Sequence, residues 1–431
     1  MIDIRLVRED PDAVRTALSR RGVDGGEVDR LVTLDVEARA EISRRDELRA
    51  AVKVLSKKVG EARRSGDTEL ADRLAAESRA VGDDERVAGV AADACAEAVR
   101  GALLVLPNLP ADDAPDVLGP EDNVVLRSWP DRDPDYSAAQ RVPHWDIGTE
   151  LGILDMERGA KLSGSMFPLY RGAGARLLRA LTSFALDAHA DVMEEVRPPT
   201  LVRTDTMVST GHLPKFAEEA YQLERDDLWA IPTSEVPLTS MWRGEILEED
   251  LLPLRLTAAS ACFRREAGAA GRDTRGLLRV HEFDKVEMFA YCTPEQSAGL
   301  LADMVERAER LLQDLGLRYR VLDLCAGDMG ISAAHTYDLE VYAPGVDQWL
   351  EVSSVSWCSD YQARRANIRY RPTGGGAPQF VHTLNGSALA WARIWAAVVE
   401  TGRQVDGSVV LPEVLRPYLR GDAVIPAPRT D

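Results

Sequence analysis

The sequence predicts an α+β fold, with a long antiparallel α-helical hairpin at the N-terminus and then an antiparallel sheet flanked by helices. Between about residues 31 and 104, apolar residues recur at intervals of three and four, and proline is almost absent. Short β-like runs bounded by glycine and proline follow in the rest of the chain. They come one after another from about residue 228 to 286, which favours an antiparallel sheet over alternating βαβ units.

The hairpin is the first element in the chain. Its two helices are separated by a turn-like segment, Ser65-Gly66-Asp67-Thr68, and Pro107 ends the second helix. At 1.5 Å per residue each helix extends roughly 50 Å, which is too long for a compact core, so we expect the hairpin to project from the rest of the protein. The second helix is rich in alanine and contains three glycines, at positions 82, 89 and 101, so we also expect the hairpin to be flexible.

Charge is divided unevenly over the hairpin. Residues 30–64 contain ten basic and six acidic side chains, whereas residues 67–104 contain four basic and nine acidic ones. One interpretation is a solvated coiled coil with ion pairs between its helices. The other is a basic face that follows a phosphate backbone. The second interpretation rests on basic residues gathered toward the turn: Lys53, Lys57, Lys58, Arg63 and Arg64.

A linker rich in proline and aspartate separates the hairpin from the remainder, so we assign residues 1–112 to a helical arm domain and residues 113–431 to a second domain. Within the second domain, the run MFPLYRG (166–172) is one of the expected strands.

Composition excludes several classes of protein. The chain has 431 residues and a net charge of −19. No stretch approaches the roughly 18 consecutive apolar residues that a membrane span needs, and the N-terminus lacks the apolar region of a secretory signal, so we expect a cytoplasmic protein without membrane contact. Its five cysteines form no CxxC pair and its six histidines show no ligand spacing, so we expect reduced thiols and no zinc site.

Residues 261–289 hold the densest cluster of charged side chains. A strand ending at Arg264, a glycine-rich loop and a returning strand would direct several guanidiniums to one place, and guanidinium groups suit phosphate oxygens. On a strand, Arg264 and Glu266 point to the same face. A surface salt-bridge ladder is the alternative interpretation. The basic members of the cluster are Arg264, Arg265, Arg272, Arg275, Arg279 and Lys285.

This cluster resembles motif 2 of the class II aminoacyl-tRNA synthetases, in the form found in the seryl-tRNA synthetase family. The resemblance covers essentially the whole chain. It includes Ile231–Pro237 as the serine-contacting loop, Glu351–Ser354 as the ATP and metal strand, residues 362–371 after it, and residues 382–395 as motif 3. A helix at 173–189 and a strand reaching Pro198-Pro199 resemble motif 1, which implies a homodimer. The N-terminal hairpin resembles the arm that grips the long variable arm of tRNA(Ser) in this family.

The resemblance implies that the chain activates L-serine with ATP and transfers it to tRNA(Ser), with Mg²⁺ as cofactor. Arg264, Arg393 and Glu351 would be the catalytic residues. Glu351 and Ser354 would hold the metal. The implied ATP site is Arg264 and Arg265, Glu266, Arg279, Phe283, Glu351, Val352, Ser353, Ser354 and Arg393. The implied serine site is Thr233, Ser234, Glu235, Arg264, Glu287, Asn385 and Ser387.

The chemistry agrees with these residue types. A serine carboxylate is already an anionic nucleophile at pH 7, so its attack on the α-phosphorus needs charge neutralisation and alignment rather than a general base. Two alternatives stay open: a ligase that loads an amino acid onto a carrier protein, and a catalytically silent binding protein.

Several positions depart from the family pattern, and they suggest a specialised duplicate, serving secondary metabolism or resisting an inhibitor. A cavity blocked by Trp357 or Trp391 would count against the whole assignment. The other departures are Ala326, His335, Ala392 and Ile394.

Overall fold

The computed structural model describes residues 1–267 and 274–428. The chain divides into two compact units, one from Ile2 to Leu106 and the other comprising Met1 and Pro107–Asp431. The linker belongs to the second unit because its backbone bonds there: the Asn108 amide donates to the Ile331 carbonyl at 2.8 Å, and the Ala111 amide to the Ala334 carbonyl at 2.8 Å. No helix in the described part of the chain is both long and apolar enough to span a membrane.

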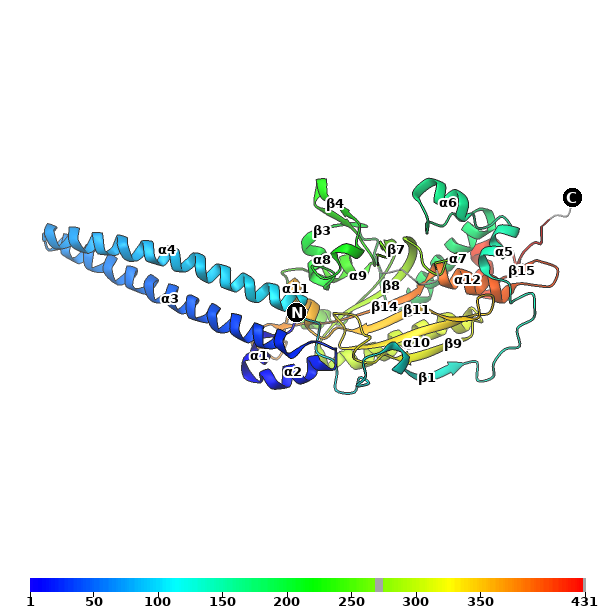
Figure 1. Cartoon of the computed structure of the whole chain (residues 1–431), viewed down its shortest axis with the longest axis horizontal. Coiled ribbons are helices and arrows are strands. Elements are labelled where there is room, and N and C mark those ends of the chain that lie inside the picture. Colours follow the sequence, from blue (N-terminus) through cyan, green and yellow to red (C-terminus); the bar gives the residue numbers. More distant parts are fainter. Residues whose placement is uncertain (268–273, 429–431) are drawn as a thin grey trace. The chain divides into compact units, whose positions relative to one another are not determined.

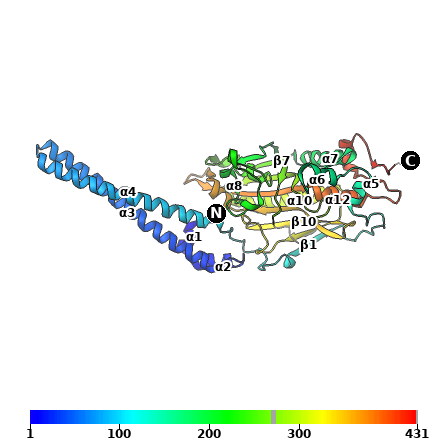
Figure 2. The same ribbon diagram turned by 45° about the horizontal axis from the view of Figure 1, so that its top comes forward.

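The first unit is helical, and its two long helices lie side by side along most of their length (Figures 1 and 2). Asp24 and Asp67 cap these helices, each side chain accepting a hydrogen bond from a backbone amide of the first turn. Gly66, with φ of +80°, makes the turn between them. The helices of this unit are α1 (Ile4–Glu9), α2 (Pro11–Ser19), α3 (Gly25–Arg64) and α4 (Thr68–Val105).

The glycines at 82, 89 and 101 do not interrupt α4, which is continuous. A glycine inside a helix costs about 1 kcal/mol relative to alanine. Packing against α3 outweighs that cost, because Ala71, Ala88, Ala92 and Leu103 are all buried.

An eight-stranded sheet forms the centre of the second unit. Its neighbouring strands pair antiparallel, except for the short edge strand β2, which runs parallel to β7. The predicted α+β fold, a helical hairpin followed by a largely antiparallel sheet, is therefore confirmed. In spatial order the strands are β1 (Val124–Trp129), β9 (Tyr319–Asp323), β10 (His335–Ala343), β11 (Gln348–Trp357), β14 (His382–Ala390), β8 (Glu282–Cys292), β7 (Leu254–Phe263) and β2 (Glu194–Glu195).

Helices cover the apolar face of this sheet. The amphipathic helix α10 (Ser297–Asp314) packs across β14 and β11, and its Met304 lies in one core cluster with Val286, Val355 and Leu384 from three different strands. Successive side chains on a strand point to opposite faces, so the residues between these apolar positions face away from α10. The opposite face of the sheet is therefore free for polar groups.

The remaining elements surround the sheet. The run MFPLYRG is not a strand: Tyr170 makes a single isolated bridge to Leu154, and the segment leads directly into a helix. The other helices are α5 (His144–Glu150), α6 (Met156–Ser163), α7 (Gly172–His189), α8 (Thr204–Thr210), α9 (Glu235–Thr239), α11 (Tyr361–Ala366) and α12 (Trp391–Gly402). The smaller sheets are β3 (Leu201–Arg203), β5 (Leu228–Ala230) and β4 (Gln222–Leu223); β13 (Gln379–Phe380), β12 (Arg369–Arg371) and β6 (Ile246–Glu248); and β15 (Val409–Val410) with β16 (Val424–Ile425).

Candidate active site

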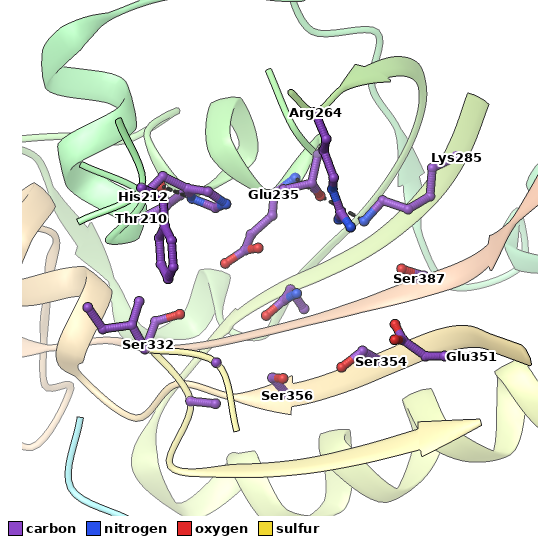
Figure 3. Close-up of a pocket in the computed structure, with 16 residues that line it drawn as sticks. Thr210, His212, Glu235, Arg264, Lys285, Ser332, Glu351, Ser354, Ser356 and Ser387 are labelled. Carbon is purple, nitrogen blue, oxygen red and sulfur yellow. Dashed lines mark hydrogen bonds between the residues drawn. The ribbon is translucent and has the colours of Figure 1, made fainter. Parts of the chain in front are cut away.

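Two adjoining cavities lie on the polar face of the large sheet. The first has a volume of about 280 Å³ and the second about 160 Å³. Figure 3 shows side chains lining the first cavity, among them Arg264 directly after β7, Lys285 on β8, Glu351 on β11 and Ser387 on β14. These four residues line both cavities, so the two form one continuous site.

The register of the central strands puts these side chains together. On β8, Lys285 and Glu287 alternate with Val286 and Met288, which are in the core under α10. On β14, Ser387 pairs with Glu287. Strand alternation thus places the polar groups of neighbouring strands on the same face, where they contact one another.

A buried polar network forms the floor of the first cavity. Lys285 forms an ion pair with Glu287, and its ammonium donates a hydrogen bond to the Thr233 hydroxyl at 2.7 Å. That hydroxyl donates in turn to Glu287 at 2.9 Å, and Asn385 donates to the other carboxylate oxygen at 3.4 Å. Buried charges are stable only when paired and hydrogen-bonded, and here each charge has several partners. The network holds the Thr233 hydroxyl in one orientation at the cavity wall.

Glu235 lies on another wall of the first cavity, at the start of α9. Burial, followed by the negative charge of Glu287, raises the pKa of Glu235 to about 7. The Gln362 amide donates to this carboxylate at 2.6 Å, and its own carbonyl accepts from the Thr383 hydroxyl at 2.6 Å. This chain of bonds fixes the orientation of Gln362 and therefore the position of Glu235.

The second cavity combines cationic, aromatic and apolar walls. The Arg264 guanidinium lies 5.2 Å from the centre of the Phe283 ring, and Arg279 forms an ion pair with Glu266. Glu266 adopts a positive φ of +51°, so the chain turns sharply directly after β7. Planar groups could insert beside the Phe283 ring, and anions could approach the guanidiniums.

Arg393 approaches the second cavity from α12. Its guanidinium donates to the Glu351 carbonyl at 2.6 Å and to the Leu278 carbonyl at 3.3 Å, and it lies 3.8 Å from the Glu351 carboxylate. Arg393 therefore joins α12, β11 and the loop between β7 and β8, while its charge stays at the cavity.

Glu351 and Ser354 meet a third oxygen donor that the sequence did not single out. Asp338 pairs with Ser354 across β10 and β11, so both side chains point to the same face. Burial, followed by the charge of Glu351, raises the pKa of Asp338 well above its usual value. Its buried Oδ1 atom has no hydrogen-bond partner among the described residues.

A third cavity adjoins the site, and His212 lines both it and the first cavity. The third cavity has a volume of about 570 Å³ and extends from Arg264 past His212 and Phe216. The Thr210 hydroxyl donates to the Met207 carbonyl at 3.0 Å, so it accepts from His212 Nδ1 at 2.9 Å and leaves the other ring nitrogen without a proton. Burial and the charge of Arg264 lower the pKa of His212 to about 3, which keeps the ring neutral.

Most of the residues expected from the resemblance line the two cavities, but not all of them. Ser234 is fully buried and its hydroxyl lies 2.6 Å from that of Ser260. Ser353 donates to the Ser387 carbonyl at 2.5 Å, and Arg265 lies over the Tyr221 ring. Arg272 lies outside the described residues. The expected residues that line one or both cavities are Thr233, Glu235, Arg264, Glu266, Arg279, Phe283, Glu351, Val352, Ser354, Asn385, Ser387 and Arg393.

Neither tryptophan that could have blocked the site lies in it. Trp357 lines a separate hollow beside Tyr337 and Arg127, and Trp391 is fully buried in the main core. Of the departures from the family pattern, Ala392 alone borders the second cavity, among the described residues.

Sequence reasoning placed Lys285 in the charged cluster of residues 261–289 but gave it no role in the site, and it missed Gln362 and Asp338. Period-two spacing from Glu287 would have assigned Lys285 to the site. The other two are brought to the site by contacts between segments that are distant in the sequence, and local spacing carries no signal for such contacts.

The basic residues of α3 fall into two groups. Toward the start of the hairpin, Arg39 pairs with Asp35 at 3.0 Å and Arg49 with Glu85 at 2.9 Å. Toward the turn, five basic side chains are exposed and have no ion pair among the described residues: Lys53, Lys57, Lys58, Arg63 and Arg64.

Comparisons with known proteins match both the N-terminal and the C-terminal part of the chain to aminoacyl-tRNA synthetases. Residues 1–110 match the seryl-tRNA synthetase N-terminal domain, and residues 218–402 match the tRNA synthetase class II core domain (G, H, P, S and T). The serine–tRNA ligase of Gemmatimonas aurantiaca is 50% identical over 99% of this chain and all of its own length. That of Nitratidesulfovibrio vulgaris is 48% identical over 98% of this chain and 99% of its own.

Two solved structures have the same fold over the whole chain. Seryl-tRNA synthetase from Pyrococcus horikoshii, complexed with ATP, has a TM-score of 0.91 at 35% identity and covers 100% of both chains. Cytoplasmic serine–tRNA ligase from Naegleria fowleri, in complex with AMP, has a TM-score of 0.86 at 27% identity and covers 100% of this chain and 99% of its own. On the identity of its relatives and their coverage of nearly every residue, the chain belongs to the seryl-tRNA synthetase family, among the class II aminoacyl-tRNA synthetases.

Proposed function

We propose that this chain is a serine–tRNA ligase. It activates L-serine with ATP to seryl-adenylate, releasing pyrophosphate, and then transfers the seryl group to tRNA(Ser), releasing AMP. The observation that carries the proposal is the continuity of the two cavities through Arg264, Lys285, Glu351 and Ser387. A small amino acid in the first cavity would lie directly beside a nucleotide in the second.

The first cavity has the groups that serine requires. Glu235 would accept a hydrogen bond from the serine ammonium, and Thr233 would help to hold that ammonium. Ser387 and Glu287 would bracket the serine hydroxyl. Alanine would leave Ser387 without this partner, and an unpaired buried polar group costs about 1 to 3 kcal/mol. The walls thus favour serine over an amino acid of similar size without a hydroxyl.

The second cavity suits ATP. Phe283 would stack on the adenine ring, Glu266 would accept from the adenine amino group, and Arg264 would contact the α-phosphate. Arg393, with Arg279, would meet the γ-phosphate. In the first step the serine carboxylate attacks the α-phosphorus, the bond to the β-phosphate oxygen breaks, and pyrophosphate carries away the electron pair. Arg264 neutralises charge on the α-phosphate while the two anions approach.

The residues near Glu351 fit a divalent cation such as Mg²⁺. Glu351 and Ser354 supply the hard oxygen donors that this ion prefers, and the unpartnered Oδ1 of Asp338 adds a third beside them. The described residues contain no group of three or more histidine, cysteine, aspartate or glutamate side chains arranged for a metal, so phosphate oxygens of ATP would complete the coordination. When bound, the ion would withdraw negative charge from the phosphates.

The exposed basic residues near the hairpin turn support tRNA as the second substrate. A polyanion displaces counterions from such side chains, and side chains already paired with carboxylates contribute less. In our proposal, residues 1–112 form the arm that binds tRNA, with residues 107–112 belonging to the second compact unit, and residues 113–431 form the catalytic domain. Arm binding would not be needed for the first step, which uses only ATP and serine.

Three further properties belong to the same proposal. Helix α7 and the segment after it resemble motif 1, so the enzyme would be a homodimer, which sedimentation would test. It would act in the cytoplasm, where charged tRNA is used. The departures from the family pattern suggest a specialised duplicate. An inhibitor titration that matches an ordinary seryl enzyme would exclude resistance as its purpose.

Serine-dependent exchange between ATP and pyrophosphate, followed by charging of total tRNA, tests the function. A serine–tRNA ligase gives both activities. Exchange without charging would instead favour a ligase that loads a carrier protein, and the absence of exchange would favour a silent binding protein.

A further inference from the structure

A buried histidine and a buried carboxylate lie behind the second cavity without lining it. His144 is the first residue of α5 and Glu400 lies in α12, and neither has any exposed surface. The imidazole Nδ1 is 2.7 Å from one carboxylate oxygen of Glu400, which also accepts from the His144 amide at 2.9 Å. The other carboxylate oxygen accepts from the Gly345 amide at 2.8 Å.

The third partner of this pair determines the tautomer of the ring. The Leu277 amide donates to His144 Nε2 at 2.9 Å. A backbone amide can only donate, so Nε2 carries the lone pair and the ring proton is on Nδ1, which donates to Glu400. The three groups thus form a directed relay from the Leu277 amide through the imidazole to the carboxylate.

Leu277 is part of the returning limb of the β7–β8 loop, and it lines the second cavity with Arg279 and Phe283. Gly276 has a φ of +58°, and a Cβ atom there would lie 2.5 Å from His144 Nε2 and 2.6 Å from a Trp145 ring carbon. The backbone therefore approaches the ring so closely that glycine alone is compatible with the contact. Gly276 and Leu277 are therefore held against α5, and Leu277 is also part of the wall of the second cavity.

The chemistry of the relay argues for positioning rather than for stability. A carboxylate in a fully buried site has a high desolvation cost, and apolar side chains of similar volume would fill the same space without it. What the relay adds is direction, because one backbone amide must point at one ring nitrogen. That amide belongs to the segment carrying Arg279 and leading to Phe283.

We propose that His144 and Glu400 are positioning residues for the nucleotide: through Leu277 they hold the returning limb of the β7–β8 loop in the shape that receives ATP. The proposal rests on the proposed function only in naming ATP as the ligand. Neither residue lines the serine cavity. Loss of the relay should therefore weaken nucleotide binding and leave serine binding nearly unchanged.

The test compares three variants. His144→Phe keeps a ring but removes both hydrogen bonds, and His144→Gln can return an acceptor to the Leu277 amide. His189→Phe is the matched control, because His189 is also buried and neither of its ring nitrogens has a partner among the described residues. The measurements are the KM for ATP and for serine in pyrophosphate exchange, and calorimetric binding of a non-hydrolysable ATP analogue.

We expect His144→Phe to raise the KM for ATP and the dissociation constant of the analogue at least tenfold, with the KM for serine changed less than twofold. His144→Gln should recover part of the loss, and His189→Phe should change neither constant. Equal increases in both KM values, or an equal effect of His189→Phe, would overturn the proposal. If His144→Phe does not fold, Gly276→Ala replaces it with the same expectation, since it displaces the same contact.

The calorimetric measurement separates this proposal from the proposed function. If the wild-type protein lacks serine-dependent exchange but binds the analogue, and His144→Phe weakens that binding, the function is wrong and the relay stands. If exchange is present and the relay variants bind the analogue as the wild type does, the relay is wrong and the function stands.

Discussion

Charged groups are used differently in the first cavity and near the hairpin turn. Lys285 and Glu287 are buried and bonded to one another, whereas Lys57, Arg63 and Arg64 are exposed and have no ion pair among the described residues. In the cavity, each charge is held by neighbours within hydrogen-bond distance. Near the turn, the basic side chains lie toward the same end of α3, and no ion pair among the described residues fixes their positions.

This difference shows two ways of recognising a charged substrate. In a site with little water, a fixed group interacts strongly with one atom of the substrate, and small displacements are costly. On an exposed helix, salt screens each charge, and the interactions sum over many flexible contacts. The cavity should therefore be sensitive to single substitutions and the hairpin to the number of charges and to ionic strength.

The largest effect should come from Arg264, which lines both cavities. Arg264→Ala should lower pyrophosphate exchange about a thousandfold, because one preorganised charge at a reacting phosphate is worth about 3 to 4 kcal/mol. The measurement is the exchange rate at saturating ATP and serine. Arg310→Ala is the control, since Arg310 is exposed on α10 and, among the described residues, its one ion pair is with Glu306. Near-normal exchange in Arg264→Ala would contradict the expectation that the cavity is sensitive to single substitutions.

The hairpin should give the next effect. The combined change of Lys57, Lys58, Arg63 and Arg64 to alanine should lower kcat/KM for tRNA charging about 10- to 100-fold and leave exchange near normal. The salt dependence of tRNA binding should become shallower by a slope of about 3, because four phosphate contacts are lost.

A second hairpin variant provides the matched control for that prediction. It also removes four charges from α3, but these guanidiniums already lie near carboxylates: Arg39, Arg44, Arg45 and Arg49. It should impair charging less. Equal impairment would mean that total charge matters and the cluster near the turn does not.

Serine binding should depend on pH through Glu235, whose pKa in the free protein is raised to about 7. The serine ammonium needs the carboxylate form, so below about pH 7 a proton must first be released. We expect the KM for serine to rise by up to about tenfold for each pH unit below 7, while the KM for ATP stays flatter. Glu235→Gln should remove this dependence. The measurement is a pH series of both KM values, and a KM for serine that still rises below pH 7 in the variant would contradict the prediction.

Glu235 should also lower stability, which is the smallest effect of the set. Its pKa is raised on folding, so the folded state binds more protons and the protein loses stability as pH rises from about 4.5 to about 7. Glu235→Gln should therefore be more stable than the wild type at pH 8 by about 1 to 3 kcal/mol and nearly equal to it at pH 5. Urea unfolding at the two pH values measures the free energy of unfolding of both proteins. If the variant and the wild type differed by the same amount at pH 5 and pH 8, the titration of Glu235 would be excluded as the cause.

Part of the fold and site was predictable from the sequence because it depends on local spacing. The apolar period of three and four predicted the helices now seen as α3 and α4. Period two predicted that Arg264 and Glu266 would share one face of a strand, but β7 ends at Phe263 and Glu266 has a φ of +51°, so the turn after the strand, and not strand alternation, brings both to the second cavity. The run MFPLYRG was wrongly predicted to be a strand. Its composition suits a strand, but tertiary contacts leave it only one bridging residue.

The residues themselves determined which groups could do chemistry: guanidiniums for phosphates, carboxylates for an ammonium or a metal ion, and basic side chains near one end of a helix for a polyanion. The tertiary structure decided which of these groups meet. It placed Asp338 beside Ser354 through strand register and joined His144 to Glu400 across 256 residues of sequence. It also put Trp357 and Trp391 away from the cavities, and it raised the pKa of Glu235 by burial. The physical reason is that helix and strand periods are local properties, whereas desolvation and cross-strand contact arise only when distant segments pack together.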